Sequence, residues 1–310
     1  MTEVVIPNPT TPSVDVPNPD VNDGGRVRVG TPGEDRLAGT SGSDNISALS
    51  SDDFASAGPG DDVVVLGEGS DTAIGGTGND SIQGNRGDDS ILGGAGDDCL
   101  RGGRDNDTVD GGEGNDILFG DRGDDIVSGG EGDDLVIGNS GLDFLEGNAG
   151  SDTLQGGKGT DSLDGGIGDD FLSGERGDDV LTGGAGADDF FFFYSADGSY
   201  GVDTLTDFNR DEGDRIVLAA NPLIPEDARF NALTGTPSGD PVAANQFDVI
   251  ENFNPATDGI SPAVIIYDPT NGLVYYNPTP TIGDENQFAR VDNTVYDADN
   301  PLQNTDFEIF

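Results

Sequence analysis

Apolar residues recur at a fixed interval of nine along the middle of the chain. From Gly30 to Phe191 the sequence divides into 18 consecutive nonapeptides without insertion or deletion, and the eighth residue of every unit is apolar. The residues on either side of it are mostly polar, and such alternation over a short stretch is typical of a half-buried β-strand. The pattern predicts a short strand at positions seven to nine of each unit, with the eighth side chain pointing inward.

The other positions of the unit carry glycine and aspartate. Position six is Asp in all 18 units, and position four is Gly in 16, with Ser51 and Asp105 as the exceptions. Glycine at positions one and two suits a turn with positive φ, where a Cβ is costly. Glycine at position four lets backbone carbonyls approach an ion closely. Because Ca²⁺ takes six to eight oxygen ligands at about 2.3–2.6 Å, such a turn with its carboxylate suits calcium.

Two units make one coil of 18 residues, in the order turn, strand, turn, strand. Coils stacked at about 4.8 Å pair each strand with its equivalent in the next coil and bury the eighth residues in a thin core. We therefore expect an all-β chain that forms a parallel β-roll. Nine coils leave eight gaps between turns on each edge, which gives at most 16 sites for Ca²⁺.

The nonapeptides resemble those of the RTX (repeats-in-toxin) calcium-binding family, with GGTGNDSIQ and GGEGDDLVI as typical units. The resemblance covers residues 30–191 and implies a right-handed parallel β-roll closed by a C-terminal β-rich cap. It also implies calcium ligands at positions six and four of the units. The predicted aspartate ligands are Asp35, Asp44, Asp62, Asp71, Asp80, Asp89, Asp98, Asp107, Asp116, Asp125, Asp134, Asp143, Asp152, Asp161, Asp170, Asp179 and Asp188. The predicted glycine ligands are Gly78, Gly87, Gly96, Gly114, Gly123, Gly132, Gly150, Gly159, Gly168 and Gly177.

Two turns depart from the pattern, and the gaps beside them, for the first turn those towards Asp35 and towards Asp71, are expected to be the weakest sites or empty. The unit that contains residues 48–53 has no glycine, so its turn is predicted to be strained and its carbonyls poorly placed. In the unit that starts at Gly102, Arg104 lies beside the expected ion and Asp105 replaces a glycine.

The charge of the chain agrees with a cation as its partner. It has 61 Asp and Glu against 13 Lys and Arg, and its net charge of −48 favours self-repulsion unless cations neutralise it. Nucleic acid and anionic membrane surfaces are poor candidates as partners, because both require a basic surface that this chain lacks. Sixteen calcium ions would reduce the net charge to −16. The chain contains no histidine, which excludes zinc-protease motifs and Ser-His-Asp triads.

Residues 1–29 and 192–310 lie outside the repeat. Residues 1–29 are expected to form a proline-rich, disordered leader, and they lack the basic start and apolar core of a Sec signal peptide. No apolar run reaches the ~18 residues of a membrane span, so membrane insertion is not expected. The single cysteine, Cys99, cannot form an internal disulfide, and we interpret it as a surface residue of a strand, with an intermolecular disulfide as the alternative.

Residues 192–218 are predicted to cap the open end of the roll, with strands at 203–208 and 215–218 around an acidic loop. Asp207, Asp211 and Asp214 either hold one more ion there or form a solvated loop. Residues 219–310 are β-rich. The segments AVIIY and LVYYN flank Pro269 and the dipeptide Asn271–Gly272, which predicts a β-hairpin.

The last six residues, TDFEIF, resemble the uncleaved C-terminal signal of RTX proteins exported by type I systems. This resemblance implies a type I ABC exporter as a partner and a bacterial protein that is secreted or held at the cell surface. We therefore expect an exported, non-enzymatic calcium-binding protein with a structural or adhesive role, which folds on binding several Ca²⁺ outside the cell.

The alternative is a secreted hydrolase or other enzyme with an RTX tail. Such enzymes carry a separate catalytic domain, whereas residues 219–310 offer no histidine and no G-x-S-x-G motif. The carboxylate pair Asp248 and Glu251 is expected to be surface charge. A pore-forming toxin would need a long apolar segment. An ice-binding roll would need repeated Thr and Asn in its turns, which only residues 76–79 supply.

One apolar patch is not required by the repeat. Ile117, Phe119, Leu135 and Ile137 occupy outward positions on what should be neighbouring strands. Two interpretations remain open. These residues either reflect strand propensity alone, or the patch is covered by the cap, by the leader or by a second copy in a homo-oligomer.

Overall fold

The computed structural model describes residues 26–194 and 200–220, together with the backbone of six further strands between residues 240 and 309. The leader up to residue 25, the hairpin turn at 269–272 and Glu251 lie outside the described residues. The described elements are all β-strands. The described residues accordingly contain no helix that is long and apolar enough to cross a membrane.

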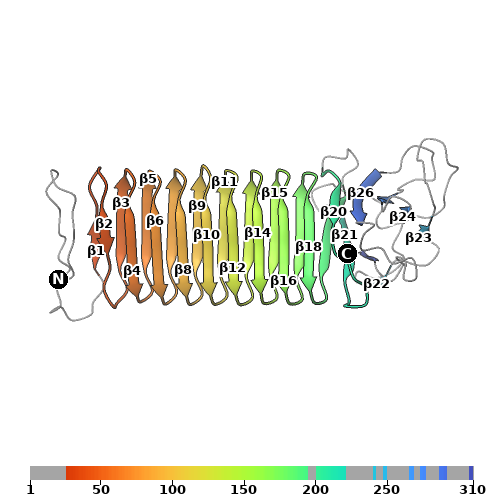
Figure 1. Ribbon diagram of the computed structural model, residues 1–310, viewed down its shortest axis with the longest axis horizontal. Coiled ribbons are helices and arrows are strands. Elements are labelled where there is room, and N and C mark those ends of the chain that lie inside the picture. The colour runs from red at the N-terminus through yellow and green to blue at the C-terminus, as the bar shows by residue number, and fades with distance from the viewer. Residues whose placement is uncertain are drawn as a thin grey trace. The chain divides into compact units, whose positions relative to one another are not determined.

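The chain forms two compact units, Met1–Gln155 and Gly156–Phe310. In the first unit, odd-numbered and even-numbered strands build two separate sheets in sequence order (Figure 1). The odd strands are β1 Val27–Val29, β3 Asn45–Ser50, β5 Val63–Glu68, β7 Ser81–Arg86, β9 Cys99–Arg104, β11 Ile117–Arg122 and β13 Leu135–Ser140. The even strands are β2 Arg36–Ala38, β4 Phe54–Pro59, β6 Thr72–Thr77, β8 Ser90–Ala95, β10 Thr108–Glu113, β12 Ile126–Glu131 and β14 Phe144–Ala149. The next odd-numbered strand is β15 Thr153–Lys158.

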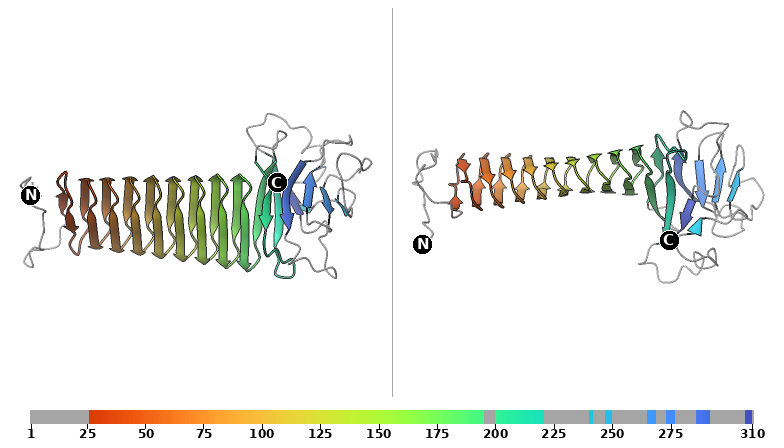
Figure 2. Two further views of the ribbon diagram at one scale, coloured as in Figure 1. Left: turned by 45° about the horizontal axis from the view of Figure 1, so that its top comes forward. Right: turned by 90° about the horizontal axis from the view of Figure 1, so that it is seen from below.

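Each strand of the first unit pairs in parallel with its equivalent 18 residues along the chain. Strand β11 shows the register, since Ile117 lies opposite Leu135, Leu118 opposite Val136 and Phe119 opposite Ile137. Figure 2 shows these strands side by side in two further views. The expected all-β parallel β-roll, with two nonapeptides in each coil, is therefore confirmed.

The strands are longer than the sequence pattern predicts. Most span six residues, positions seven to nine of one unit and one to three of the next, as in β7. In β7 both Ile82 at position eight and Gly84 at position one face inward. The prediction of three-residue strands was wrong, because the inward-facing glycine has no side chain to mark its position as buried. The core itself is as expected, with Leu100, Leu118 and Val136 fully buried at position eight.

Positive φ occurs at positions two and four of the unit, and not at position one. Gly76 and Gly78 show this with φ of 126° and 118°, which favour glycine strongly. A Cβ on Gly78 would lie 2.3 Å from the carbonyl oxygen of Gly60 in the preceding coil. The expectation of a positive φ at position one was wrong, since that residue belongs to the extended strand.

The second unit continues the same pattern and then departs from it. Its strands are β16 Ser162–Ile167, β17 Phe171–Arg176, β18 Val180–Ala185, β19 Asp189–Tyr194, β20 Asp203–Leu205, β21 Arg215–Ala220, β22 Asp240–Pro241, β23 Phe247–Val249, β24 Ile265–Asp268, β25 Leu273–Tyr276, β26 Asn286–Val291 and β27 Phe307–Ile309. Strand β20 pairs in parallel with β18, and β21 with β19. The two strands expected in the segment after the roll are thus confirmed, and each extends a different sheet.

The C-terminal strands of the second unit also pair as β-structure. Strands β24 and β25 are antiparallel neighbours, which confirms the hairpin expected around residues 269–272. Strand β27, near the end of the chain, pairs in parallel with β21 and antiparallel with β22.

Candidate metal centre

The aspartates at position six lie buried in the turns between strands, and each connects two coils. The backbone N–H of Asp62 donates to Oδ1 of Asp80, 2.8 Å away. The carbonyl oxygen of Asp80 in turn accepts a hydrogen bond from the N–H of Cys99 at 2.8 Å. The same contact recurs at intervals of 18 residues in both units, for example from Asp98 to Asp116 and from Asp161 to Asp179. One oxygen of each carboxylate is therefore used to hold the preceding coil in register.

The second carboxylate oxygen is different. Oδ2 is buried and accepts no hydrogen bond in the turns of Asp53, Asp62, Asp71, Asp80, Asp89, Asp98, Asp107, Asp116, Asp125, Asp134, Asp179 and Asp188. Burial of a charged oxygen without a partner costs several kcal/mol, so a row of such atoms requires a cation or a proton. Eleven of these aspartates are among the 17 that the sequence predicts as ligands, and the twelfth, Asp53, is not among them.

Backbone carbonyls converge on the same space. A point at the missing Cβ of Gly75 lies 2.3 Å from Oδ2 of Asp80 and 2.5 Å from the carbonyl oxygen of Gly93. The equivalent point at Gly93 lies 2.3 Å from Oδ2 of Asp98 and 2.6 Å from the carbonyl oxygen of Gly111. A side chain at position one would therefore collide with both oxygens, and glycine lets a carboxylate and a carbonyl oxygen approach the backbone closely here. Hard oxygens of these two kinds are the ligands that Ca²⁺ prefers.

Each such space combines carboxylate with carbonyl oxygens, and is not a cluster of acidic side chains. In the part of the chain that the structure describes, no three side chains of Asp, Glu, His or Cys come together as metal ligands. A donor set of hard oxygens suits calcium better than softer metals such as zinc, which prefers nitrogen and sulfur. Cys99 is exposed on β9, as the sequence analysis expected.

Burial disturbs the ionisation of these carboxylates. Desolvation raises the pKa of Asp98 to about 7 and that of Asp107 to about 8, and neighbouring aspartates add to both shifts. Desolvation likewise raises the pKa of Asp80 to about 6. A divalent cation beside these oxygens would stabilise their charged form. Calcium and protons should therefore compete for the turns.

The glycines at position four hold the coils close together. The N–H of Gly78 donates to the carbonyl oxygen of Ala95 at 2.8 Å, and that of Gly96 donates to Glu113 at 2.7 Å. Like Gly78, Gly96 has a positive φ. The role of the position-four carbonyls as calcium ligands stays a prediction.

A second ladder of side chains, which the sequence analysis missed, runs along position five. The N–H of Asp97 donates to Oδ1 of Asn79 at 3.2 Å, and the N–H of Asn115 donates to Oδ1 of Asp97 at 3.0 Å. Position five is Asp or Asn in 11 of the 18 units, and this frequency was the available signal. Because these side chains are exposed, they link the coils without forming a buried ion site.

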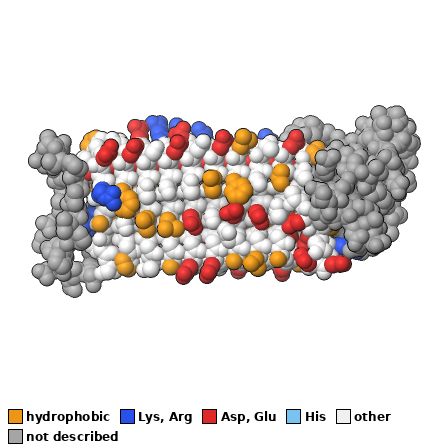
Figure 3. All heavy atoms as spheres, in the orientation of Figure 1, with side chains coloured by type: hydrophobic (Ala, Val, Ile, Leu, Met, Phe, Trp, Pro, Cys, Tyr) orange, Lys and Arg blue, Asp and Glu red, His pale blue; other side chains and the backbone are white. Residues whose placement is uncertain are grey.

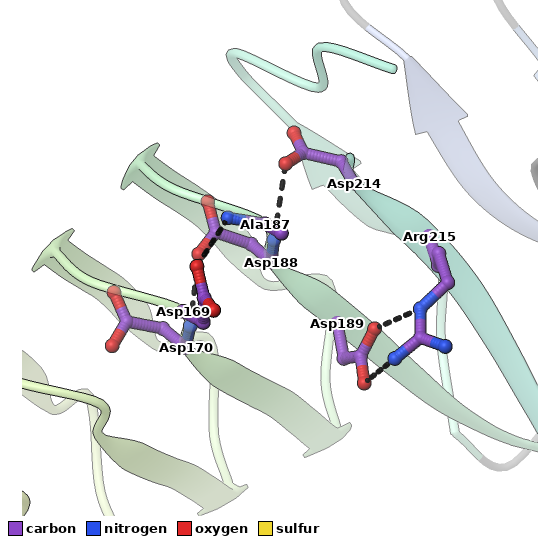
Figure 4. A network of polar contacts seen from close by, with 7 residues as sticks. All are labelled: Asp169, Asp170, Ala187, Asp188, Asp189, Asp214 and Arg215. Atoms are coloured by element: carbon purple, nitrogen blue, oxygen red, sulfur yellow. Dashed lines mark hydrogen bonds and ion pairs between the residues drawn. The ribbon is translucent and has the colours of Figure 1, made fainter. Parts of the chain in front are cut away.

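The position-six ladder extends beyond the last nonapeptide (Figure 4). The N–H of Asp188 donates to Oδ1 of Asp214 at 3.1 Å, and the N–H of Asp179 donates to Oδ1 of Asp203 at the same distance. Both carboxylates take the place of a position-six aspartate. They were missed because the spacing rises from 18 residues to 26 and 24.

In the acidic loop of the second unit, two of the three carboxylates considered for an additional ion accept backbone hydrogen bonds. Asp207 accepts hydrogen bonds from the N–H groups of Gly183 and Gly184 at 2.9 and 2.7 Å. Asp214 accepts at both oxygens, from Asp188 and from the N–H of Asn209. Asp207 and Asp214 therefore cap backbone N–H groups.

The apolar patch expected on the odd-numbered strands is present. Ile117 and Leu135 are paired neighbours, as are Phe119 and Ile137, and Ile117 is 42% exposed. The guanidinium of Arg101 lies 4.5 Å from the ring centroid of Phe119 and covers part of the patch. Figure 3 shows one face of the molecule, on which hydrophobic side chains lie scattered among polar and acidic ones.

Comparison with known families agrees with this geometry. The model of the RTX calcium-binding nonapeptide repeat matches the chain continuously over residues 29–192, which is more than half of its length. The individual matches cover residues 29–64, 38–73, 65–100, 74–109, 101–136, 137–172 and 164–192. No curated protein matches the chain.

Proposed function

We propose that this chain is an exported bacterial protein that folds on binding several Ca²⁺ outside the cell and has a structural or adhesive role there. The proposal starts from its family, since the chain belongs to the proteins with RTX calcium-binding nonapeptide repeats. The observation that carries this proposal is the row of buried Oδ2 atoms without hydrogen-bond donors. A carbonyl oxygen of the next coil lies near the same carboxylate, beside the position-one glycine, as at Gly75 and Gly93.

The charge of the chain supports coupling between calcium and folding. In the cytosol, where calcium is scarce, a net charge of −48 and many buried carboxylates oppose the compact state. Millimolar calcium outside the cell removes both obstacles. Since the turns do not exist in the unfolded chain, the free energy of calcium binding becomes free energy of folding.

Export rests on the family resemblance and on the C-terminal residues TDFEIF, which resemble a type I secretion signal. The partner implied is a type I ABC exporter, which would accept the chain while it is unfolded. In its role outside the cell, the chain binds calcium and does not catalyse a reaction.

A secretion assay with the full chain tests the export part of this proposal. Cells that carry a type I exporter should release the chain into a calcium-containing medium, and removal of residues 305–310 should retain it in the cell. A chain that reaches the medium equally without an exporter would contradict this part. Equilibrium dialysis of the purified chain at millimolar calcium should find many bound ions, and one ion or none would contradict the calcium part.

A further inference from the structure

The turns of the first coil satisfy their position-six carboxylates without an ion. The backbone N–H and the hydroxyl of Thr31 both donate to Oδ2 of Asp35, the hydroxyl at 3.0 Å. Thr40 makes the same two contacts with Oδ2 of Asp44, the hydroxyl at 2.9 Å. Oδ2 is the oxygen that lacks a donor in most later turns, whereas here two donors already occupy it.

The backbone of these two turns differs in a way that explains the contacts. Position two has a positive φ in later units, as at Gly76, whereas Thr31 and Thr40 are outside that region. A β-branched residue strongly disfavours positive φ. The N–H and hydroxyl of each threonine are therefore turned toward the carboxylate. Strands β1 and β2 correspondingly have three residues each and end at position nine.

The next three units fill the space that calcium would need. Position one is Ala48, Ala57 and Leu66 in these units, and all three side chains are fully buried. At Gly75, in the following unit, a Cβ would lie only 2.3 Å from Oδ2 of Asp80. A side chain at position one thus leaves no room for an ion beside the carboxylate, so Oδ2 of Asp53, Asp62 and Asp71, which also lacks a donor, has to be neutralised by a proton in place of calcium. The side chain also gives strands β3 to β5 a second core residue each, which replaces ionic with hydrophobic stabilisation.

An arginine supplies positive charge at this end of the roll. Arg28 is buried in β1 and occupies the place of a position-eight residue, opposite Ile46. Its guanidinium interacts electrostatically with Asp44. The N–H of Arg26 donates to the other carboxylate oxygen of Asp44, at 2.6 Å. Asp44 therefore has donors at both oxygens and a cationic side chain nearby.

We propose that residues 26–74 form an N-terminal cap of the roll that binds no calcium, and that the calcium sites begin at the turn between Gly75 and Asp80. Two of the aspartates predicted as ligands, Asp35 and Asp44, then bind threonine in place of calcium. The sequence predicts at most 16 calcium sites, one in each gap between successive turns on an edge. Five of these gaps begin at the first five units, so at most 11 sites are left. This inference rests on the proposed function, because it divides the turns of a calcium-folded roll into two classes.

Anomalous scattering from crystals of the full chain grown in calcium tests the inference directly. Calcium peaks are expected from the gap between Asp80 and Asp98 onward, with no peak in the five gaps that involve the turns of Asp35, Asp44, Asp53, Asp62 and Asp71. Peaks in any of those five gaps would overturn the inference and leave the proposed function intact. The absence of calcium from every turn would overturn both.

A stoichiometry measurement in solution gives a second test. The double variant Thr31→Gly with Thr40→Gly restores two glycines at the start of each turn and removes the hydroxyl donors. It should bind up to two more calcium ions than the unaltered chain, as counted by equilibrium dialysis. Thr77→Gly, at an exposed third position, is the matched control and should leave the count unchanged. An unchanged count in the double variant would contradict the role of the threonines.

Discussion

The backbone N–H of Asp116 donates to Oδ1 of Asp134, 2.7 Å away, and leaves Oδ2 of Asp134 buried without a donor. One carboxylate therefore has two roles, since it holds the preceding coil in register and presents an oxygen to the space beside Gly129. That space also contains the carbonyl oxygen of Gly147. Calcium at this position would stabilise the same carboxylate on which the contact between coils depends, which links ion binding to the stacking of coils.

Replacing Asp134 by asparagine should weaken calcium binding without removing the contact between coils. An asparagine carbonyl can still accept the hydrogen bond from Asp116, but the negative charge is lost. We expect at least one bound ion fewer, and a loss of about 1.5–3 kcal/mol of stability in calcium, comparable to that of a charge-assisted interaction. Calcium titration monitored by calorimetry measures both.

Asp133→Asn is the matched control, because Asp133 is the adjacent residue and accepts only an exposed hydrogen bond, from the N–H of Ser151. Asparagine already performs this role at position five, where Asn115 accepts from Asp133. The control should keep the calcium affinity of the unaltered chain. Equal losses in both variants would show that net charge alone determines binding.

The ion-free roll should become more stable as the pH falls. Desolvation raises the pKa of Asp98 and of Asp134 from 3.8 to about 7 in the folded chain. A carboxyl whose folded pKa is raised stabilises the fold at low pH, and this contribution is lost as the pH rises through about 7. In excess chelator, circular dichroism should show more β-structure at pH 5 than at pH 8.

Calcium affinity should change with pH in the opposite direction to the stability of the ion-free roll. Protons compete with the ion for the same carboxylates, so the calcium concentration at half-saturation should rise as the pH falls from 8 to 5. A half-saturation point that is independent of pH would mean that carboxylates other than these bind the ions.

The sequence predicts core positions only where they carry an apolar side chain. Leu118 could be assigned to the core because an apolar residue recurs every nine positions. The second inward position could not, because it is glycine in most units and glycine gives no hydrophobic signal. Only Ala48, Ala57 and Leu66 reveal it, and they also mark the units in which a side chain fills the ion space.

Other features depend on geometry that a repeat count does not contain. Asp203 and Asp214 continue the ladder with altered spacing, since longer connections precede them. Thr31 stands where glycine is usual, and its contact with Asp35 follows from the local backbone conformation. The sequence thus predicts the architecture and the ligand type well, and predicts less well which turns differ from the rest.

Leu118→Ala should destabilise the calcium-loaded roll by about 2–5 kcal/mol, because the side chain is fully buried and its loss leaves a cavity in a thin core. Ile117→Ala, at the neighbouring exposed position, should cost much less. Chemical unfolding in excess calcium measures both. Similar costs would mean that the outer face is as tightly packed as the core, for instance by a second molecule on the apolar patch.

Leu49→Gly should stabilise the roll. Leu49 has a φ of 92° and is 43% exposed, so the substitution relieves an unfavourable conformation and removes little buried surface. We expect a gain of about 1 kcal/mol in thermal unfolding with calcium present. Ser47→Gly, in the same strand and without positive φ, should instead cost about 0.5–1 kcal/mol. A loss in both variants would refute the assignment of strain to this turn.

Far-UV circular dichroism of the full chain during a calcium titration tests the central claim most directly. With excess chelator at pH 8 the spectrum should be that of a coil, and millimolar calcium should produce β-structure in one cooperative transition. Magnesium at the same concentration should not, because it is smaller and requires octahedral geometry with retained waters. A β-sheet spectrum that persists in chelator at pH 8, or that magnesium induces equally well, would contradict calcium-dependent folding.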